Sequence, residues 1–345
     1  MGKSSNNSLT ISDIARIAKV STTTVSRYLN GKYEYMSAET QETIRAAIEK
    51  NGYRPNQAAR TLKTKKSNLI AVVSPRIAVQ SSPLFLQGVD NILRNTNYDY
   101  TILSSGDDFS RECSCLDRCI DQQVDGILYS PTTENFNKAV SLAQSGVPIV
   151  LFDRYLPDWP YSAVYIDHRE LIYGMMNHLF QNGYDEVALL AGTYSSVDTR
   201  YFREQAFLSY IKENKSAIVG RVLRFERGDC MSESIESILH EYLAEPNTGR
   251  RAILAIDMQS LHTVLKLKRK LSIQIPQDFA ICGYDSLDWS SLFSPSITYL
   301  EQPLFEMGCE ASKILLDLIA AGKEIRKTIC IHGTLNIGES TQKNE

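Results

Sequence analysis

The sequence predicts an all-helical N-terminal head followed by an α/β body of two doubly wound parallel-sheet lobes. Apolar residues recur at helical spacing through the first fifty residues, and from Asn68 short apolar strands alternate with helix-sized segments. Charge divides the chain at the same point, because residues 1–66 carry 12 basic and five acidic residues while the whole chain has a net charge of −3. A basic head on an acidic body indicates a head that binds a polyanion, the alternative being a solvated basic arm.

Composition limits the class of protein. A chain of 345 residues suggests two or three domains. No run of 18 apolar residues is present and no apolar segment follows a basic start, so we expect neither a membrane span nor a secretory signal. The seven cysteines, an odd number, fit a reducing compartment. The expected location is therefore the cytoplasm.

The head begins with two short predicted helices. Thr10 is a candidate N-cap, with Asp13 placed to bond back to it, and an apolar stripe follows. Ser21 can cap the second helix, whose Val25 and Leu29 are four residues apart and face inward. The same spacing leaves four polar residues of that helix facing outward: Thr22, Thr23, Ser26 and Arg27.

A third helix is expected from Ser37, the N-cap, to Gly52, which ends it. Two short helices joined by a tight turn and braced by a third form a helix-turn-helix unit, which we place at residues 1–54. The N-terminal residues of such a second helix enter the major groove of DNA. We therefore expect DNA contacts from Thr10, Ser21, Thr22, Thr23, Ser26 and Arg27. The alternative is that Thr22 to Thr24 only cap the helix.

Residues 55–67 form the predicted link. Pro55 stops the preceding helix, and Asn56 can cap a further helix that ends near Lys63. Such a short helix is unstable alone. We expect it to fold when two copies meet on DNA, with Leu62 as an apolar wedge in the minor groove. The alternative is a frayed linker.

The segments "ISDIARIAKVSTTTVSRYLNG" and "MSAETQETIRAAIEKNGYRPNQAARTLKTKKSNLIAVV" together resemble the head of the LacI/GalR family of transcriptional regulators. The segment "VSRYLNG…YMS" resembles the corresponding segment of the family branch that represses sugar-acid (ketodeoxygluconate-type) catabolism. The resemblance implies that Thr22, Thr23 and Arg27 contact the major groove. It also implies that Ala59, Leu62 and Lys63 occupy the minor groove at the operator centre. Asn56 is a further expected DNA contact. In the turn before the second helix, the family usually has glycine where this chain has Lys19.

The body contains two series of predicted strands. The first is "NLIAVV", "YTIL", "VDGILY" and "PIVLF", and the second is "VALLAG", "AILAI" and "FAICGYD". The family resemblance implies a periplasmic-binding-protein-like body over 68–340, with effector-binding and dimerisation functions. It places lobe one at about 68–163 and 296–324, and lobe two at about 167–292 and 327–340. The three crossings between lobes then fall near 164–167, 292–298 and 323–328.

Polar residues that follow strands are the candidate ligand contacts, because ligands of open α/β sheets bind at the carboxyl ends of strands. In the family, the positions matching Asp153, Arg203 and Asp285 hold the effector. The alternative for each is an ordinary loop or capping residue. Arg76 and Arg154 add cations that suit an acidic sugar. The complete expected effector set is Asp153, Arg203, Asp285, Arg76, Arg154 and Asp257.

Two further features qualify this interpretation. The family pattern Ala-Asn-Asp reads Ala255-Ile256-Asp257 here, so an amide that usually bonds the effector is missing. The cysteines near residue 116 do not have a usual zinc spacing, and we expect Cys113, Leu116 and Ile120 to face the core. We expect no metal, no cofactor and no catalytic residues.

The sequence therefore predicts a dimeric regulator that binds an inverted-repeat operator in double-stranded DNA and does not act at a membrane. A sugar or sugar-acid effector bound between the lobes would release it from the operator. A corepressor-dependent regulator, a non-catalytic sugar-binding receptor and a sugar-modifying enzyme with a DNA-binding head remain as alternatives.

Overall fold

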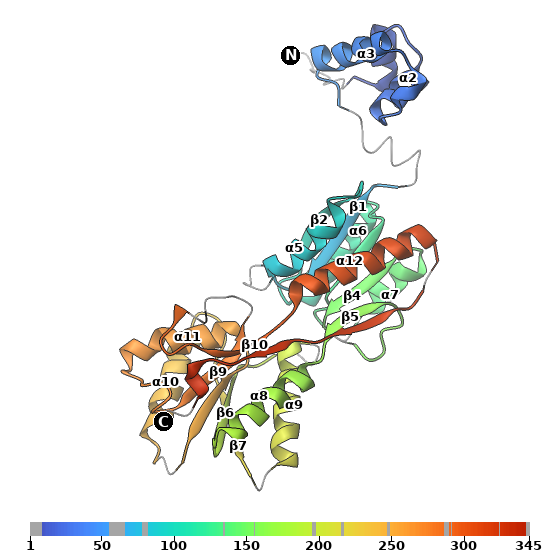
Figure 1. Cartoon of the computed structure of the whole chain (residues 1–345). Helices are drawn as coiled ribbons and strands as arrows, with labels where there is room; N and C mark the ends of the chain where they lie inside the picture. The colour runs from blue at the N-terminus through green and yellow to red at the C-terminus, as the bar shows by residue number, and fades with distance from the viewer. Residues whose placement is uncertain are drawn as a thin grey trace, which may run out of the picture. The chain divides into compact units, whose positions relative to one another are not determined.

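The computed structural model describes residues 9–54, 66–77, 82–133, 135–154, 156–194, 198–214, 217–246, 249–285, 290, 292–323 and 325–342 (Figure 1). The chain divides into two compact units, Met1–Ser67 and Asn68–Glu345. This division falls where the sequence predicts that the body begins.

The first unit is a three-helix head. Its helices are α1 (Ile11–Ile17), α2 (Thr22–Leu29) and α3 (Ala38–Asn51), with a 3-10 turn, η1 (Tyr33–Tyr35), between the last two. Thr10 and Asp13 form the predicted capping box, and Gly52 ends α3 in the left-handed region at φ 59°. One core residue from each helix is fully buried: Ile14, Val25 and Ile44. The predicted helices and caps are confirmed.

Lys19 occupies the turn between α1 and α2 with φ 54°, the left-handed region where a side chain is unfavourable. We expect Lys19→Gly to stabilise the head by about 1 kcal/mol. In the full chain this should increase the hydrogen-exchange protection of the slowest head amides about fivefold. The control Lys50→Gly, in the last turn of α3, should lower the protection by a similar factor. Unchanged protection in Lys19→Gly would show that this backbone conformation costs nothing here.

Lobe one of the second unit is built on a parallel sheet of six strands in the order β11-β5-β4-β3-β1-β2. Its strands are β1 (Leu69–Ser74), β2 (Asp99–Ser104), β3 (Gly126–Tyr129), β4 (Ile149–Asp153), β5 (Ala163–Ile166) and β11 (Thr328–Ile331). Helices α5 (Ser82–Leu93) and α12 (Leu304–Ala321) pack against each other, and α12 lies on the sheet (Figure 1). Helices α6 (Phe109–Asp121) and α7 (Asn137–Gln144) belong to the core of the opposite face.

Lobe two has a second six-stranded sheet in the order β12-β10-β9-β8-β6-β7. Its strands are β6 (Glu186–Ala191), β7 (Val219–Arg224), β8 (Arg251–Ala255), β9 (Ala280–Asp285), β10 (Thr298–Glu301) and β12 (Thr334–Asn336). All neighbours are parallel except β10 and β12, which are antiparallel. The helices are α8 (His168–Gln181), α9 (Thr199–Glu213), α10 (Met231–Ala244) and α11 (Met258–Lys270), with the 3-10 turn η3 (Glu339–Thr341) near the end.

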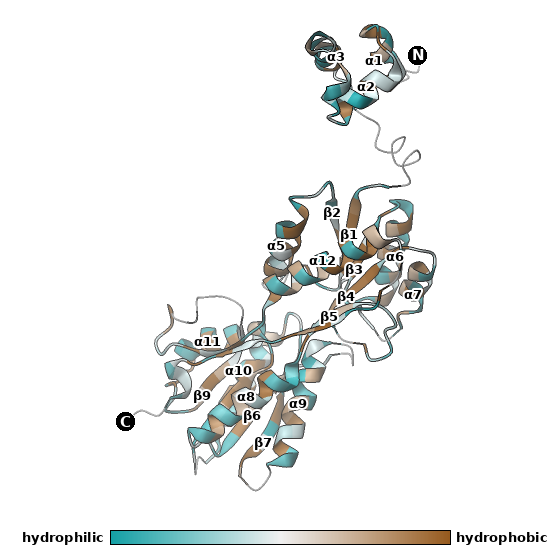
Figure 2. Cartoon of the chain, turned by 45° about the vertical axis from the view of Figure 1, so that its right-hand side comes forward, coloured by the Kyte–Doolittle hydropathy of each residue, from teal (hydrophilic) through white to brown (hydrophobic). Residues whose placement is uncertain are grey.

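Alternation along the strands explains why helices cover both faces of each sheet. In β1, Ile70 and Val72 join the core beneath α5 and α12, while Ala71 and Val73 join the core beneath α6 and α7. Figure 2 shows the central strands as hydrophobic and the outer helix faces as hydrophilic. The predicted pair of doubly wound lobes is confirmed, with β12 as the antiparallel exception.

The chain crosses between the lobes three times, and two predicted crossings are wrong. The first crossing, between β5 and α8, lies where it was expected. The second follows β10 at Gln302–Pro303 rather than at 292–298, and the third follows β11 at His332–Gly333 rather than at 323–328. Strands β10 and β11 have only four residues each, so their apolar pattern does not indicate the sheet to which they belong. Hydrogen bonding to β9 and β5 decides it.

The prediction of which α6 residues face the core is also wrong, except for Leu116. Cys115, Leu116 and Cys119 are buried, whereas Cys113 is half-buried and Ile120 is 53% exposed. The reason is Glu112, which occupies a position in the core despite its charge. Its carboxylate accepts hydrogen bonds from the Tyr129 hydroxyl (2.8 Å) and from the Thr132 amide. A buried carboxylate interrupts the apolar stripe from which the face was predicted.

Candidate functional site

The exposed surface of α2 is formed by hydroxyl residues and one arginine. Thr22, Thr23 and Arg27 are exposed, and Ser26 is half-buried. The Arg27 guanidinium lies 4.8 Å from the centre of the Tyr35 ring, which holds it near the helix surface. These side chains form the polar surface of α2, with the two threonines in its first turn and Arg27 in its last turn.

Two of the predicted DNA-contact residues also have structural roles. The Ser21 hydroxyl accepts a hydrogen bond from the Thr24 amide at 3.1 Å, and the Thr10 hydroxyl donates to Asp13 at 2.7 Å. The capping interpretation therefore holds for Ser21 and Thr24, while Thr22 and Thr23 stay available on the surface. Asn56, Ala59, Leu62 and Lys63 lie outside the residues that the structure describes.

A cavity of about 710 Å³ lies between the lobes of the second unit. Five of the six predicted effector residues line it, namely Asp153, Arg203, Arg76, Arg154 and Asp257. The side chain of the sixth, Asp285 at the end of β9, lies outside what the structure describes. The cavity has the size of a small-molecule site. The lining contains five cationic side chains (Arg76, Arg154, Arg200, Arg203, Lys266) and three carboxylates (Asp153, Asp198, Asp257).

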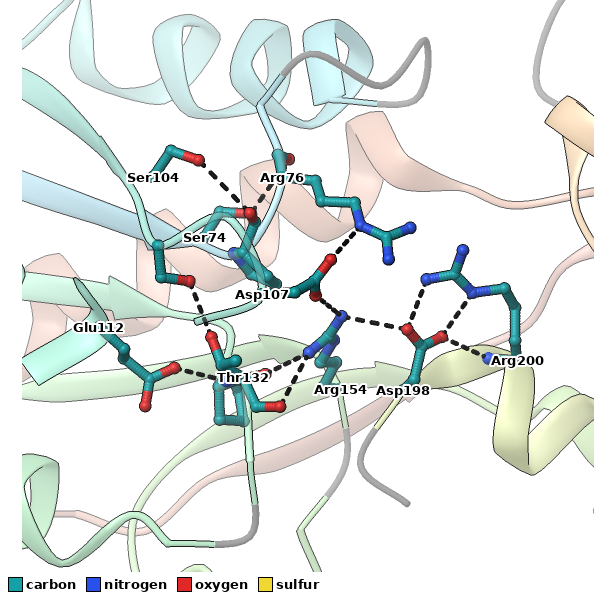
Figure 3. Close-up of polar contacts among 12 residues, drawn as sticks. Ser74, Arg76, Ser104, Asp107, Glu112, Thr132, Arg154, Asp198 and Arg200 are labelled. Carbon is teal, nitrogen blue, oxygen red and sulfur yellow. Dashed lines mark hydrogen bonds and ion pairs between the residues drawn. The ribbon is translucent and has the colours of Figure 1, made fainter. Parts of the chain in front are cut away.

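Ion pairs connect the two sides of this cavity (Figure 3). Asp107, which follows β2, accepts from Arg76 and from Arg154, the latter at 3.0 Å. Arg154 reaches across to Asp198 of lobe two at 3.3 Å. Asp198 also accepts from Arg200 Nε at 2.7 Å. The charges therefore alternate from one lobe to the other.

Asp198 is the most buried aspartate in this set of ion pairs, with 3% of its surface exposed. Burial alone would raise its pKa, but hydrogen bonds from Arg200 and the charges of Arg200 and Arg154 outweigh burial and hold the pKa well below its usual value. The aspartate is therefore ionised at neutral pH. It also caps α9 by accepting from the Arg200 amide at 2.9 Å.

Arg154 is fully engaged with protein groups. Besides its two aspartates, it donates to the Pro131 carbonyl at 2.7 Å. A second, long hydrogen bond of 3.5 Å goes to the Thr132 carbonyl. Thr132 is itself held by Glu112, so α6 supports the position of this arginine. Arg154 is suited to joining the lobes rather than to binding a ligand directly.

Arg203 belongs to α9 and lines the cavity. It donates to the Ile256 carbonyl (2.9 Å) and to the Gln302 side chain (2.8 Å), and its guanidinium lies 3.6 Å from the centre of the Tyr284 ring. Burial lowers its pKa. The Ile256 side chain is fully buried, so this departure from the family pattern places a core residue there and only its carbonyl bonds Arg203.

Asp153 and Asp257 differ in their bonding. Asp257 caps α11 through the Ser260 amide (2.9 Å) and accepts from Arg200 at 3.2 Å. Asp153 has φ 66°, and among the described residues no side chain donates to its carboxylate. Burial raises the pKa of Asp153 against the opposing charges of Arg154 and Arg203. Asp153 is therefore the carboxylate best placed to accept hydrogen bonds from the hydroxyl groups of a ligand.

His168, at the start of α8, is 5% exposed, and its buried Nε2 has no hydrogen-bond partner. Burial and then the charge of Arg203 hold its pKa well below 6.5. The unfolded chain then binds a proton that the folded chain does not, so the free energy of unfolding should fall as the pH drops below 6.5, by up to about 1.4 kcal/mol per unit. Urea unfolding between pH 7.5 and 5.5 checks this.

His168→Gln should have a shallower slope than the unchanged protein. The exposed His240→Gln is the matched control and should keep the full slope. Equal slopes in all three proteins would contradict the assignment to His168.

Sequence reasoning missed Asp107, Asp198, Arg200 and Gln302. Asp107 follows a predicted strand by a few residues, so the strand-end rule that selected Asp153 applies to it as well. Asp198 and Arg200 bond each other locally, but their other partners, Arg154 and Asp257, are far away in the sequence, and no local pattern indicates them. Among the described residues, no cluster of metal-ligating side chains occurs and no helix is long and apolar enough to cross a membrane.

Two protein-family models match the chain. Bacterial regulatory proteins of the lacI family match residues 10–56, and a periplasmic binding protein-like domain matches residues 176–341. The first match covers the head. The second covers most of lobe two, together with α12 and β11 of lobe one.

Individual proteins match over nearly the whole chain. The HTH-type transcriptional regulator KdgR of Bacillus subtilis (strain 168) is 30% identical over 330 residues, covering 95% of this chain and 96% of KdgR. The probable HTH-type transcriptional regulator EndR of Paenibacillus polymyxa is 28% identical over 340 residues, with 97% and 98% covered. The solved lac repressor dimer bound to operator and the anti-inducer ONPF has a TM-score of 0.80 at 22% identity, covering 97% and 99%, and shares the fold.

Proposed function

Since the chain belongs to the LacI family of bacterial transcriptional regulators, we propose that it represses genes of carbohydrate use and leaves its operator when a sugar or sugar acid binds between its lobes. The observation that carries the effector part of this proposal is the cavity between the lobes, with its excess of cationic side chains. The related proteins KdgR and EndR are transcriptional regulators, so we propose no catalytic reaction for this chain.

The DNA-binding part rests on the polar surface of α2. Small hydroxyl side chains at the start of a short helix and an arginine in its last turn suit phosphate and base-edge contacts. We propose that Thr22, Thr23 and Arg27 enter the major groove, and that Asn56, Ala59, Leu62 and Lys63 act at the operator centre. The related lac repressor is described as a dimer on its operator, which supports an inverted-repeat operator and a homodimer here.

The allosteric step follows from the position of the ligand. A molecule that contacts both lobes favours one spacing of the lobes over another, and it shifts the population toward that spacing. We propose that the shift disfavours the arrangement of the link that is competent to bind DNA. A corepressor would act with the opposite sign.

The deciding experiment measures the affinity of the full chain for the upstream region of its own gene, with and without a panel of sugars and sugar acids. We expect one sugar or sugar acid to weaken binding at least tenfold, about 1.4 kcal/mol of coupling. A ligand that strengthens binding would identify a corepressor. No preference over random DNA would contradict the regulatory function.

Arg27→Ala should weaken operator binding by about 1–3 kcal/mol and reduce sequence preference if the arginine contacts a base. Loss of affinity that is equal for operator and random DNA would indicate a phosphate contact instead. Arg45→Ala, on α3 and paired with Glu42, is the matched control. It should leave operator affinity unchanged.

A further inference from the structure

The row of charges across the cleft is longer than the part drawn in Figure 3. It continues from Arg200 to Asp257 and ends at Arg227, whose Nη1 is 3.7 Å from the same Asp257 oxygen that Arg200 contacts at 3.2 Å. The complete row is Arg76, Asp107, Arg154, Asp198, Arg200, Asp257 and Arg227. It contains four arginines and three aspartates, so it begins and ends with a cation.

Both end arginines have donors that no described residue accepts. Arg76 bonds Asp107 through Nε alone, and no described residue accepts from its terminal nitrogens. Nη1 of Arg227 is buried and makes no hydrogen bond to any residue that the structure describes. A buried donor without an acceptor costs about 1–3 kcal/mol, so such donors mark the place where a ligand atom is expected.

Arg76, at one end of the row, also approaches the arginines of lobe two. Figure 3 shows the guanidinium groups of Arg76 and Arg200 facing one another, and both line the cavity. Burial lowers the pKa of Arg227, and the charges of Arg200 and Arg76 lower it further. Arg76 of lobe one and Arg200 and Arg227 of lobe two therefore lie close together. Asp257 is the carboxylate that pairs with the last two.

We propose that an oxyanion of the effector, a carboxylate or a phosphate, binds between Arg76 of lobe one and Arg200 and Arg227 of lobe two. It supplies the one negative charge that the alternating row lacks. Guanidinium groups bind such oxyanions through paired N–H donors. This inference rests on the proposed function, because it names the chemical class of the effector and the residues that select it.

The location explains how an anion differs from a neutral sugar at this site. Asp153 can accept hydrogen bonds from the hydroxyl groups of either, but an oxyanion adds charge-assisted hydrogen bonds to arginines from both lobes at once. Its interaction energy depends on the distance between the lobes, and this is the property that couples binding to a change of lobe arrangement. Arg154 is then a positioning residue that holds Asp107 and Asp198 apart at a fixed spacing.

Calorimetric titration of the full chain at constant ionic strength tests the subsite. The probes are gluconate, glucose 6-phosphate, glucose and inorganic phosphate. We expect at least one of the two anionic sugars to bind tenfold or more tightly than glucose, and the stronger of them identifies carboxylate or phosphate. Arg76→Gln and Arg227→Gln should each lower that affinity at least tenfold, and should lower it by a larger factor than they lower the affinity for glucose. Lys270→Gln, at the end of α11 and paired with Glu236, is the control and should bind as the unchanged protein does.

Two results would overturn the subsite. One is that both variants keep the full affinity for the anionic sugar. The other is that neither anionic sugar nor phosphate binds more tightly than glucose at millimolar concentration. If specific DNA binding persists in that case, the regulatory function stands and only the subsite fails. If anions bind as expected but DNA binding shows no sequence preference, the proposed function fails and the subsite stands.

Discussion

Replacement of Asp198 by alanine should lower the free energy of unfolding of the body by about 3–5 kcal/mol, because it leaves two buried arginines without their shared counter-charge. Arg154 and Arg200 both donate to this carboxylate, and all three side chains are buried. Arg154 keeps Asp107 and Arg200 keeps Asp257, but each loses a buried, charge-assisted hydrogen bond that nothing replaces. Urea unfolding at neutral pH measures the loss.

Asp108→Ala provides a matched control. Asp108 caps α6 by accepting from the Arg111 amide at 2.7 Å, just as Asp198 caps α9, but it is exposed and belongs to no ion row among the described residues. Loss of a cap alone should cost about 1 kcal/mol. If the two variants lose the same stability, the row contributes nothing beyond helix capping.

The pH dependence of this effect has a definite sign. The folded pKa of Asp198 lies below the unfolded value of 3.8, so its contribution is complete well above pH 3.8. It declines as the pH falls through that value toward the lower folded pKa. The difference in stability between the unchanged protein and Asp198→Ala should therefore be smaller at pH 3 than at pH 7.

Gly308→Ala should destabilise the body by about 2–3 kcal/mol, because it pushes α12 away from α5. A Cβ at Gly308 would lie 2.2 Å from the Phe85 carbonyl oxygen, and one at Gly88 would lie 2.1 Å from the Phe305 carbonyl oxygen. These neighbours are backbone atoms and cannot turn aside as a side chain could. Chemical denaturation followed by circular dichroism measures the effect.

Gly174→Ala is the matched control, since Gly174 is also helical but a methyl group added there would meet no neighbouring atom within 4 Å. Alanine there should stabilise α8 by up to about 1 kcal/mol. The displacement in Gly308→Ala also has a functional consequence, because α12 begins just after Gln302, the acceptor of Arg203. If Gly308→Ala is as stable as Gly174→Ala, the two helices separate without an energetic cost.

The head was predictable because its structure is decided locally. Thr10 with Asp13, Ser21, Ser37 and Gly52 each act within a few residues of their own position. The body was predictable where strands are buried on both faces, as in β1 and β3. It was not predictable at β7, an edge strand that has no buried residue.

The cleft was partly predictable for a related reason. The strand-end rule brings Asp153 and Asp257 into one cavity, as expected of parallel sheets. It does not show which residues are already paired. Arg154 and Asp198 are 44 positions apart and come from different lobes, so their bond follows only from the folded arrangement.

Lobe one is assembled from two distant stretches of the chain, β1 to β5 and then α12 to β11. During synthesis its core cannot close until residue 331 has left the ribosome, and lobe two also waits for β12 at 334–336. The three helices of the head are complete after their first 51 residues. A chain that terminates early would therefore contain the complete helices of the head without the cavity between the lobes.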